Sequence, residues 1–395
     1  MSARPFLFKR PRLAAELADR LLGLSAFGAE PTLCLAAPRR TGKSTFIRLD
    51  LAPELENRHV ETVYVDLWSD RTADPSTLIA EAIRAALRRA EGLPLKAARS
   101  IGLAKLGVAG VSIDIDKLGR QDGPTLADAL ESLLERTGKR LALLIDEAQH
   151  ALVSDAGVNA MFALKAARDR LNTREDAADG PNLAIVLTGS HRDKLSRLVQ
   201  GRDQPFLGTG VTDFPVLGRA YTDAYTLWLN QRLARDNAFD PVEVHAAFEI
   251  LGHRPELLIQ LLKDIALELG NAGELKTALA DGATAIRQRR DDEFLGAWMA
   301  LAPLQQAVLA HLADRREQVA PFSAPALAAY ATAIGSAVEA AAVQSAIAAL
   351  RDKNLIWKSA RGQYALEDQA MGEWIVAHAP SRAVEARPPD RTTSA

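Results

Sequence analysis

Eight consecutive residues in the first part of the sequence are of the types that hold a nucleoside triphosphate. They read Ala37-Pro38-Arg39-Arg40-Thr41-Gly42-Lys43-Ser44. They fit the phosphate-loop pattern Gly-x-x-x-x-Gly-Lys-Ser/Thr except at the first position. Alanine is the smallest residue after glycine, so we expect the tight turn to form at Ala37 as well. In such a loop, backbone N–H groups at the start of a helix point at the phosphates.

The last residues of this segment each have a defined task. Gly42 lets the backbone approach the phosphates, Lys43 supplies a charge for the β- and γ-phosphates, and the Ser44 hydroxyl can bind Mg²⁺. A chance match is the competing interpretation, but the segment follows an apolar run and opens a predicted helix. We therefore expect residues 37–44, together with Thr45, to bind ATP and Mg²⁺.

Two acidic residues, Asp146 and Glu147, directly follow the apolar run over residues 141–145. A carboxylate at the carboxyl end of a parallel strand projects into the crevice where such folds bind ligands. We expect Asp146 to hold Mg²⁺ and Glu147 to polarise the attacking water as a general base. Alone, the pair could be solvated residues at a strand end, but its occurrence downstream of a phosphate loop favours a hydrolytic site.

Five further polar residues are candidates for this site, each with a structural alternative. Thr188 and Ser190 follow another apolar run and could bond the γ-phosphate or the lytic water, or could cap the next helix. Asp66 ends a predicted strand and either shapes the site or caps the next segment. Arg202 could reach a neighbouring subunit's γ-phosphate, and Arg254 could contact the phosphates of its own chain. Both arginines could equally be surface cations.

The sequence lacks the motifs of GTPases, small-molecule kinases and zinc-binding proteins. A GTPase needs a guanine-reading Asn-Lys-x-Asp segment, which the sequence does not contain. A small-molecule kinase normally lacks the Asp-Glu pair. The seven histidines show no metal-ligand spacing, and with the single Cys34 we expect no structural zinc.

The elements that would position these residues alternate between strand and helix. Apolar runs predict five strands, at residues 31–37, 60–67, 140–146, 183–188 and 211–216. Helical spacing predicts helices at residues 12–23, from 43 to Pro53, at 76–90 and at 125–137. This alternation indicates an α/β fold in which helices cover both faces of a parallel sheet. Residues 101–115, rich in Gly and Val, are expected to form a hairpin or two short strands.

The second half of the sequence is predicted to be helical. Residues 221–290 show no strand signal; three helical stretches, at 302–314, 323–333 and 338–352, then lead into short strand signals at 354–358 and 364–366. Three helices and a hairpin are the order of a winged helix-turn-helix. Residues 295–380 nevertheless carry six basic and seven acidic side chains, and the third helix has no Lys or Arg before Arg351. A DNA partner and a protein partner therefore both stay open.

Composition sets the broad class. The chain has 395 residues, enough for two or three domains, with 48% hydrophobic and 25% charged residues and a net charge of −2. This balance excludes a histone-like basic protein. We find no signal peptide, and the uncharged segment 318–338 lacks the hydrophobicity of a membrane span. We expect a cytoplasmic protein without membrane contact.

The phosphate loop, Leu-Leu-Ile-Asp-Glu-Ala-Gln, Leu-Thr-Gly-Ser and the Gly-x-x-Pro element at residues 252–255 resemble the archaeal-type ATPase family of the STAND/AAA+ group. The order is also similar to that of origin-initiator ATPases. The resemblance spans roughly residues 5–375. It implies a P-loop ASCE core with a helical lid and a C-terminal winged-helix domain. It also implies ATP hydrolysis by Asp146 and Glu147, and adenine packing near Phe8–Pro11.

These expectations divide the chain into five parts. They are an N-terminal linker helix (1–30), an ATPase core (31–218), a helical lid (219–294), a winged helix (295–380) and a disordered tail (381–395). The function that we expect is ATP hydrolysis that drives a conformational or assembly switch, with a possible homo-oligomer. The alternative is a nucleotide-regulated DNA-binding protein that acts through the winged helix.

Overall fold

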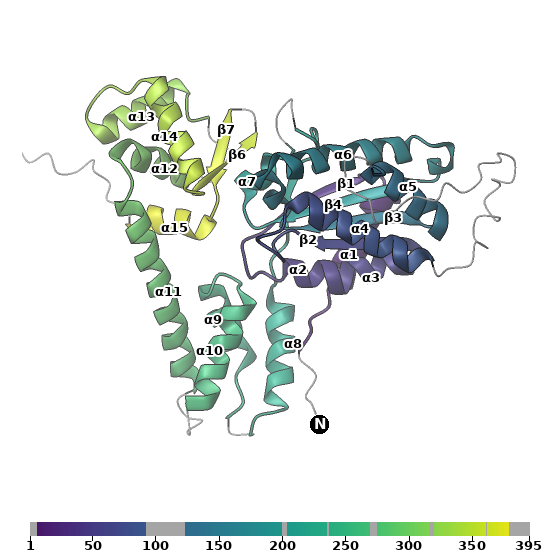
Figure 1. The fold of residues 1–395 in the computed structure, drawn as a ribbon. Helices are drawn as coiled ribbons and strands as arrows, with labels where there is room; N and C mark the ends of the chain where they lie inside the picture. The colour runs from purple at the N-terminus through teal and green to yellow at the C-terminus, as the bar shows by residue number, and fades with distance from the viewer. Residues whose placement is uncertain are drawn as a thin grey trace, which may run out of the picture. The chain divides into compact units, whose positions relative to one another are not determined.

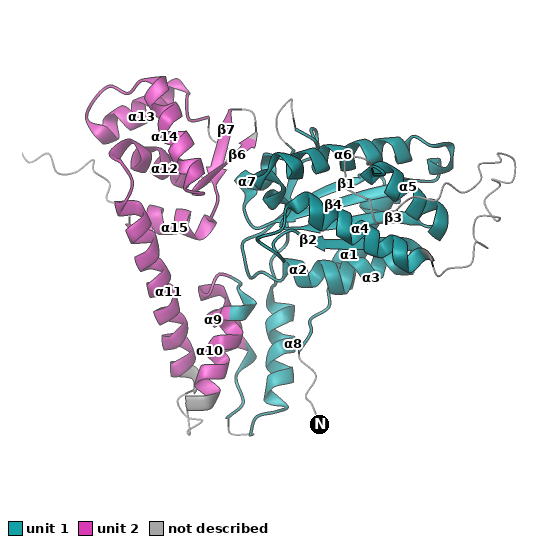
Figure 2. Cartoon of the chain, viewed as in Figure 1, with its two compact units in different colours: residues 1–241, 253–256 teal, residues 242–252, 257–395 magenta. Residues whose placement is uncertain are grey.

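A computed structural model describes residues 6–91, 123–199, 204–234, 237–268, 275–315, 320–360 and 362–378. The expected hairpin at 101–115, Arg202 and the tail after residue 380 lie outside these ranges. The chain divides into two compact units (Figure 2). The first contains residues 1–241 and 253–256, and the second contains residues 242–252 and 257–395.

The first unit is built on a five-stranded sheet in which every pair of strands is parallel. The strand order is β2-β3-β4-β1-β5 (Figure 1). The strands are β1 (Thr32–Ala36), β2 (Val60–Asp66), β3 (Arg140–Asp146), β4 (Leu183–Gly189) and β5 (Val211–Asp213). This confirms the expected parallel α/β sheet. Because all strands run the same way, the segments that follow β1, β3 and β4 meet at one edge.

Helices cover both faces of the sheet, and alternate strand residues pack against each layer. One layer contains α1 (Pro11–Leu22), α2 (Lys43–Phe46), a π-helical turn η1 (Ile47–Leu51) and α3 (Ala52–Asn57). It packs on Leu33, Leu35, Leu144 and Val186. The other layer contains α4 (Pro75–Glu91), α5 (Leu126–Thr137) and α6 (Asp155–Asn172), and it packs on Cys34, Leu143, Ile145 and Leu187.

The helix after the phosphate loop is longer than the sequence predicted. It was expected to end at Pro53, but α2, η1 and α3 continue without a break to Asn57. A proline inside a helix removes one N–H and crowds the preceding turn. The chain widens into a π turn just before it, where the Ala52 N–H bonds to the Ile47 carbonyl. This wider turn accommodates Pro53, so the predicted end of the helix was wrong.

The remaining elements of the first unit are short, apart from one helix. They are the 3₁₀ helices η4 (Ala148–Val153) and η5 (Glu175–Ala177), and the helices α7 (Arg192–Ser196) and α8 (Arg219–Asn230). The extended segment before α1 packs its Phe6 ring against Tyr221, Tyr225 and Trp228 of α8. The N-terminal segment is thereby joined to the end of the core.

The second unit holds the remaining helices and a two-stranded antiparallel sheet. The elements are α9 (Pro241–Ile250), α10 (Pro255–Glu268), α11 (Leu275–Met299), α12 (Pro303–Arg315), α13 (Ala324–Ile334), α14 (Ala340–Asp352), β6 (Ile356–Ala360), β7 (Gln363–Leu366) and α15 (Gln369–His378). Three helices and a hairpin thus follow one another as expected, and α15, which the sequence did not predict, closes their shared core. Helix α11 runs through residue 294, where a domain boundary was expected. None of the described helices has the length and hydropathy that crossing a membrane requires.

Candidate nucleotide site

The phosphate loop lies between β1 and α2, with two left-handed residues. Arg40 has φ 68° and Gly42 has φ 87°, so the backbone curls before α2 begins. The Thr41 hydroxyl donates to the Pro38 carbonyl at 2.8 Å, and the Ala37 N–H donates to the Gly189 carbonyl at 3.2 Å. Ala37 does not have a positive φ. An alanine therefore fits at the position that usually holds glycine.

Lys43 and Glu147 are brought together from opposite sides of β4. Their side chains form an ion pair, with Nζ 3.6 Å from Oε1, and the Lys43 side chain is only 5% exposed. Burial lowers the pKa of Lys43, and the negative charges of Glu147 and Asp146 oppose that change. Burial alone would raise the pKa of Glu147. The charge of Lys43 and the hydrogen bonds from Gln149 and Ser190 outweigh it, so this pKa is lowered.

Asp146 is buried and accepts hydrogen bonds from both neighbouring strands. Thr188 of β4 donates its hydroxyl to Oδ1, and Tyr64 of β2 donates its hydroxyl to Oδ2 at 3.2 Å. Because β4 lies between β3 and β1, Thr188 holds the Asp146 carboxylate on the side that faces β1, the strand before the phosphate loop. The sequence had assigned no role to Tyr64, because nothing in a single chain shows which strand will become the neighbour of β3.

Glu147 is fixed by a second pair of donors. Ser190 donates to Oε2 at 2.9 Å, and Gln149 donates to the same oxygen. The backbone of Glu147 is left-handed, with φ 52°, which is unusual for a residue with a side chain. The sequence analysis missed Gln149. The only signal was its place in Asp-Glu-Ala-Gln, two residues beyond the acid.

Asp66 lies beside Asp146 across the β2–β3 ladder. Its carboxylate accepts the Trp68 N–H at 2.8 Å, so it organises the turn that leaves β2. Burial raises the pKa of Asp66, and the nearby charges of Asp146 and Glu147 add to this rise. This position agrees with the interpretation of Asp66 as a cap of the segment after β2. A role of Asp66 in shaping the site stays a prediction.

The segment around Arg254 belongs to the first unit and lies at the phosphate loop. Glu256 pairs with Arg40 of the loop at 3.1 Å, and His253 Nδ1 lies 3.0 Å from the Leu217 carbonyl oxygen. Arg254 stands between these two anchored residues. Among the expected site residues, Ser44 and Thr45 are exposed in the first turn of α2. Arg202 lies outside the described residues.

The segment before α1 borders the same region. The Arg10 N–H bonds to Asp50 at 3.1 Å, and its guanidinium donates to the Pro215 carbonyl at 2.8 Å. The guanidinium also lies 4.9 Å from the centre of the Phe214 ring. These contacts attach the segment expected to pack on adenine to the helix that follows the phosphate loop.

The oxygen donors at this edge suit Mg²⁺. The ion prefers oxygen ligands and usually keeps waters and substrate phosphates in its shell, with only one or two protein groups. Ser44 offers a hydroxyl and Asp146 a carboxylate. Within the described ranges no cluster of three or more His, Cys, Asp or Glu side chains could cage a metal. The residues present therefore fit a magnesium ion shared with the nucleotide.

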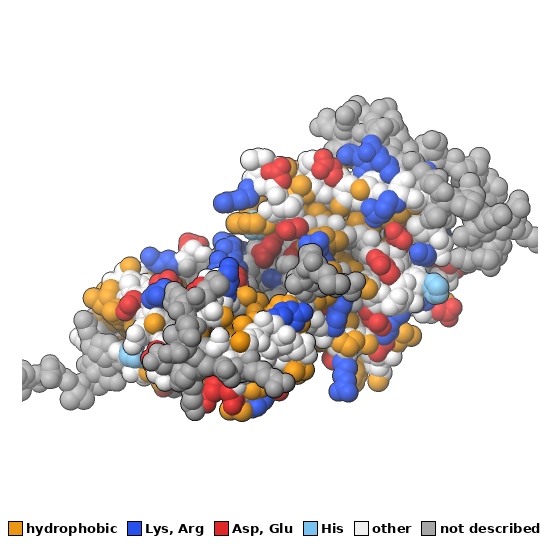
Figure 3. Space-filling view, turned by 90° about the horizontal axis from the view of Figure 1, so that it is seen from below, with side chains coloured by type: hydrophobic (Ala, Val, Ile, Leu, Met, Phe, Trp, Pro, Cys, Tyr) orange, Lys and Arg blue, Asp and Glu red, His pale blue; other side chains and the backbone are white. Residues whose placement is uncertain are grey.

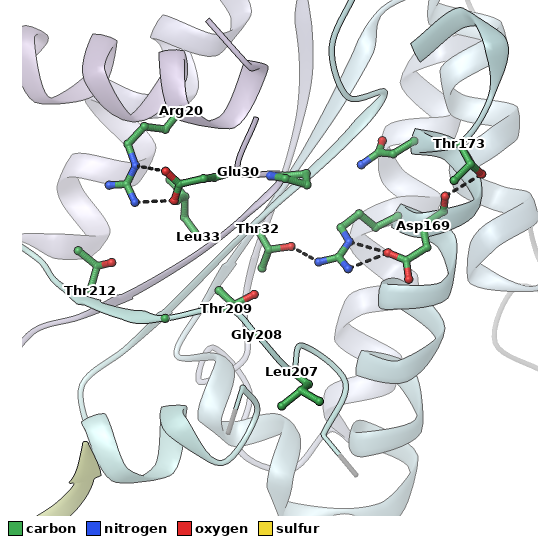
Figure 4. Close-up of a pocket in the computed structure, with 14 residues that line it drawn as sticks. Arg20, Glu30, Thr32, Leu33, Asp169, Thr173, Leu207, Gly208, Thr209 and Thr212 are labelled. Carbon is green, nitrogen blue, oxygen red and sulfur yellow. Dashed lines mark hydrogen bonds and ion pairs between the residues drawn. The ribbon is translucent and has the colours of Figure 1, made fainter. Parts of the chain in front are cut away.

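A separate cavity of about 540 Å³ lies at the amino end of β1, away from this site (Figure 4). Two arginines line the cavity, and both bind side chains that also line it. Arg20 pairs with Glu30 at 2.8 Å, while Arg168 bonds Asp169 and Thr32. The charges of the cavity thus offset one another, and it holds none of the expected site residues.

Comparison with known proteins agrees with this fold. Residues 29–198 match the AAA domain family. None of the curated proteins matches the chain. The solved structure of the Walker-type ATPase of Pyrococcus abyssi is similar, with 18% identity and a TM-score of 0.52 over 95% of this chain and 97% of that one. The ORC2 protein of Aeropyrum pernix in its ADPNP–ADP complexes is similar too, with 16% identity and a TM-score of 0.51 over 94% of both chains. Residues 29–198 therefore match an AAA domain, and the fold of the chain is similar to that of these two solved structures.

Proposed function

We propose that the chain binds ATP with Mg²⁺ at the phosphate loop and hydrolyses it. The observation that carries this proposal is the ion pair between Lys43 and Glu147, 3.6 Å apart, beside the buried Asp146. A phosphate-binding cation, a metal-binding carboxylate and a general base are thereby gathered at one edge of the sheet. The adenine nucleotides in the ORC2 structure, a protein of the same fold, support ATP as the nucleotide.

In this mechanism the loop amides and Lys43 hold the β- and γ-phosphates. Ser44 and Asp146 would hold Mg²⁺, which neutralises phosphate charge when it is bound. Glu147 takes a proton from water while the water oxygen forms a bond to the γ-phosphorus. The bond from that phosphorus to the bridging β–γ oxygen breaks, and ADP and phosphate leave. In the nucleotide-free protein the charge of Lys43 and the hydrogen bonds from Gln149 and Ser190 lower the pKa of Glu147 and keep its carboxylate ionised.

Nucleotide binding is also expected to act as a switch. Lys43 must exchange Glu147 for the phosphates, which frees Glu147 to orient water. Arg254 lies in the short segment 253–256 of the first unit. The residues that precede and follow this segment in the sequence, 242–252 and 257–395, belong to the second unit. A γ-phosphate contact there would connect the nucleotide state to that unit and so drive a conformational change or assembly. The division into core, lid and winged helix remains part of this proposal.

Phosphate release by the wild type and by Glu147→Gln tests the enzymatic proposal. We expect the variant to bind ATP as the wild type does, and to lose turnover by at least about 10³-fold, because its amide cannot accept the proton. Glu175→Gln, an exposed position in η5, serves as the matched control and is expected to turn over normally. Turnover by Glu147→Gln at the wild-type rate would remove Glu147 from the mechanism.

A second candidate function is nucleotide-regulated DNA binding. The order of α12, α13 and α14 followed by the β6–β7 hairpin favours it, because winged helix-turn-helix modules have this order. Residues 295–380, however, carry six basic and seven acidic side chains and so have no basic excess. The face of the molecule seen in Figure 3, which is a different face, also shows basic, acidic and apolar side chains interspersed. A mobility assay at two salt concentrations, with ATP and with ADP, decides between the readings. Salt-sensitive binding supports DNA as the partner, and no binding in any nucleotide state excludes it.

A further inference from the structure

Two guanidinium groups lie on one indole ring beside the phosphate loop. The ring belongs to Trp68, which follows β2 by two residues. The Arg39 guanidinium carbon lies 5.3 Å from the ring centre, and the Arg71 carbon lies 4.8 Å from it. Both distances are within the range at which an aromatic ring attracts a cation.

Neither of these arginines has a carboxylate partner or a hydrogen bond in the part of the chain that the structure describes. The next loop residue behaves differently, since Arg40 pairs with Glu256 at 3.1 Å. An indole ring attracts a guanidinium without neutralising it and leaves its N–H groups available. Arg39 is therefore held in place as a charged group that can still donate hydrogen bonds to an anion.

The position of Arg39 in the phosphate loop indicates which anion its guanidinium can contact. Arg39 is part of the phosphate loop, four positions before Lys43. The Trp68 ring lies 3.9 Å from the His150 ring, and the His150 backbone N–H donates to the Glu147 carbonyl at 2.9 Å. The positive charge of Arg39 contributes to lowering the pKa values of Glu147, His150 and His191. Its guanidinium therefore acts on the hydrolytic centre itself.

We propose that Arg39 is a further catalytic residue that contacts the γ-phosphate from within the same chain, and that Trp68 is its positioning residue. This inference rests on the proposed ATPase function. As the γ-phosphorus bonds to water and leaves the bridging oxygen, negative charge develops on the γ-phosphate oxygens and on ADP. A guanidinium with free N–H groups donates to these oxygens, and it does so in a fixed planar geometry that lysine lacks.

The experiment compares Arg39→Ala and Arg39→Gln with the matched control Arg71→Ala, which removes the other cation from the same ring. The measured quantities are kcat and KM for ATP, and the dissociation constants of ATPγS and ADP. We expect both Arg39 variants to lose at least about 10²-fold in kcat, as is typical when one charge-stabilising donor is removed. They should also lose most of the preference for ATPγS over ADP. Arg71→Ala should keep both properties within about threefold.

Trp68 is tested by the same measurements. Trp68→Ala should lower kcat more than it raises KM, because Arg39 remains present but is no longer held. Trp68→Phe should restore most of the rate, because a phenyl ring still attracts the guanidinium. A role of Trp68 in packing alone would instead lower the melting temperature and leave kcat of the folded protein unchanged.

The outcomes separate this inference from the proposed function. Loss of turnover in Glu147→Gln together with normal kcat and normal ATPγS preference in both Arg39 variants would overturn the role of Arg39 alone. Equal losses in Arg39→Ala and Arg71→Ala would also overturn it, since they indicate a general positive field. Absence of turnover in the wild type would contradict the ATPase proposal. The ratio of ATPγS to ADP affinity would then still decide whether Arg39 meets the γ-phosphate.

Discussion

The Lys43 ammonium lies 3.6 Å from the Glu147 carboxylate, and each group needs a different partner when nucleotide is bound. Lys43 is required by the phosphates, and Glu147 by the attacking water. In their ion pair the two groups compensate each other's burial, which would otherwise be costly for both charges. Arrival of a triphosphate is expected to break this pair, so binding and activation of the base are one event.

Thr188→Val is expected to destabilise the fold as well as the site. The side chain of Thr188 is fully buried, and its hydroxyl donates to Asp146, which is also buried. Valine has nearly the same shape but leaves the buried carboxylate without that donor, at a cost of about 1–3 kcal/mol. Urea unfolding measures this difference. Thr212→Val, on the exposed side of β5, is the control and should stay within about 0.5 kcal/mol of wild type.

Thr188→Val is also expected to lower the rate of ATP turnover. A less firmly held Asp146 should lower kcat by about 10-fold or more, because misplacing a catalytic group is costly, while ATP affinity changes little. Unfolding and turnover equal to those of Thr212→Val would show that the Thr188–Asp146 bond has no role.

Gly189→Ala is expected to disturb Glu147 indirectly. An added Cβ at Gly189 would collide with Gln149 Oε1, at the end of a side chain that donates to Glu147. Gln149 must then move, so Glu147 loses one of its two donors. We expect a several-fold lower kcat with nearly unchanged ATP affinity, measured by phosphate release and by nucleotide titration.

Gly210→Ala is the matched control for this change, since an added Cβ there meets no atom within 4 Å. Two results would count against a positioning role for Gln149. One is a normal rate in Gly189→Ala, and the other is an equal loss in both alanine variants.

Asp128→Asn is expected to weaken the start of α5 in a pH-dependent way. The Thr125 hydroxyl donates to Asp128, and this bond, with the charge of Arg170, lowers the pKa of the carboxylate. A carboxyl group whose pKa is lower in the folded state stabilises the fold above its unfolded pKa of about 3.9. That contribution is lost as the pH falls through the lower folded pKa.

The difference in unfolding free energy between wild type and Asp128→Asn should therefore be largest at neutral pH, up to about 1 kcal/mol. It should shrink below about pH 3.9. Urea unfolding between pH 7 and pH 3 measures it, with the exposed Asp179→Asn as control. A difference that stays constant across this range would contradict the role given to the charge of Asp128.

The sequence was sufficient to predict the parallel sheet, because each buried strand is an uninterrupted apolar run between predicted helices. It also located the phosphate loop and the acidic pair. It could not place Tyr64 or Trp68, since their contacts with Asp146 and Arg39 exist only after the strands of the sheet lie side by side. Gln149 was missed because its only signal was its place two residues after Glu147. The helix beyond Pro53 was missed because a π turn offsets the usual effect of proline.

The central claim is that the chain grips a triphosphate through the phosphate loop and Lys43, and a calorimetric titration with ATP and Mg²⁺ tests it most directly. The wild type should bind ATP, and Lys43→Ala should bind it at least about 10-fold more weakly, because it lacks the cation that meets the β- and γ-phosphates. A wild type without measurable affinity for ATP or ADP, or a Lys43→Ala variant that binds ATP as tightly as the wild type, would contradict the account.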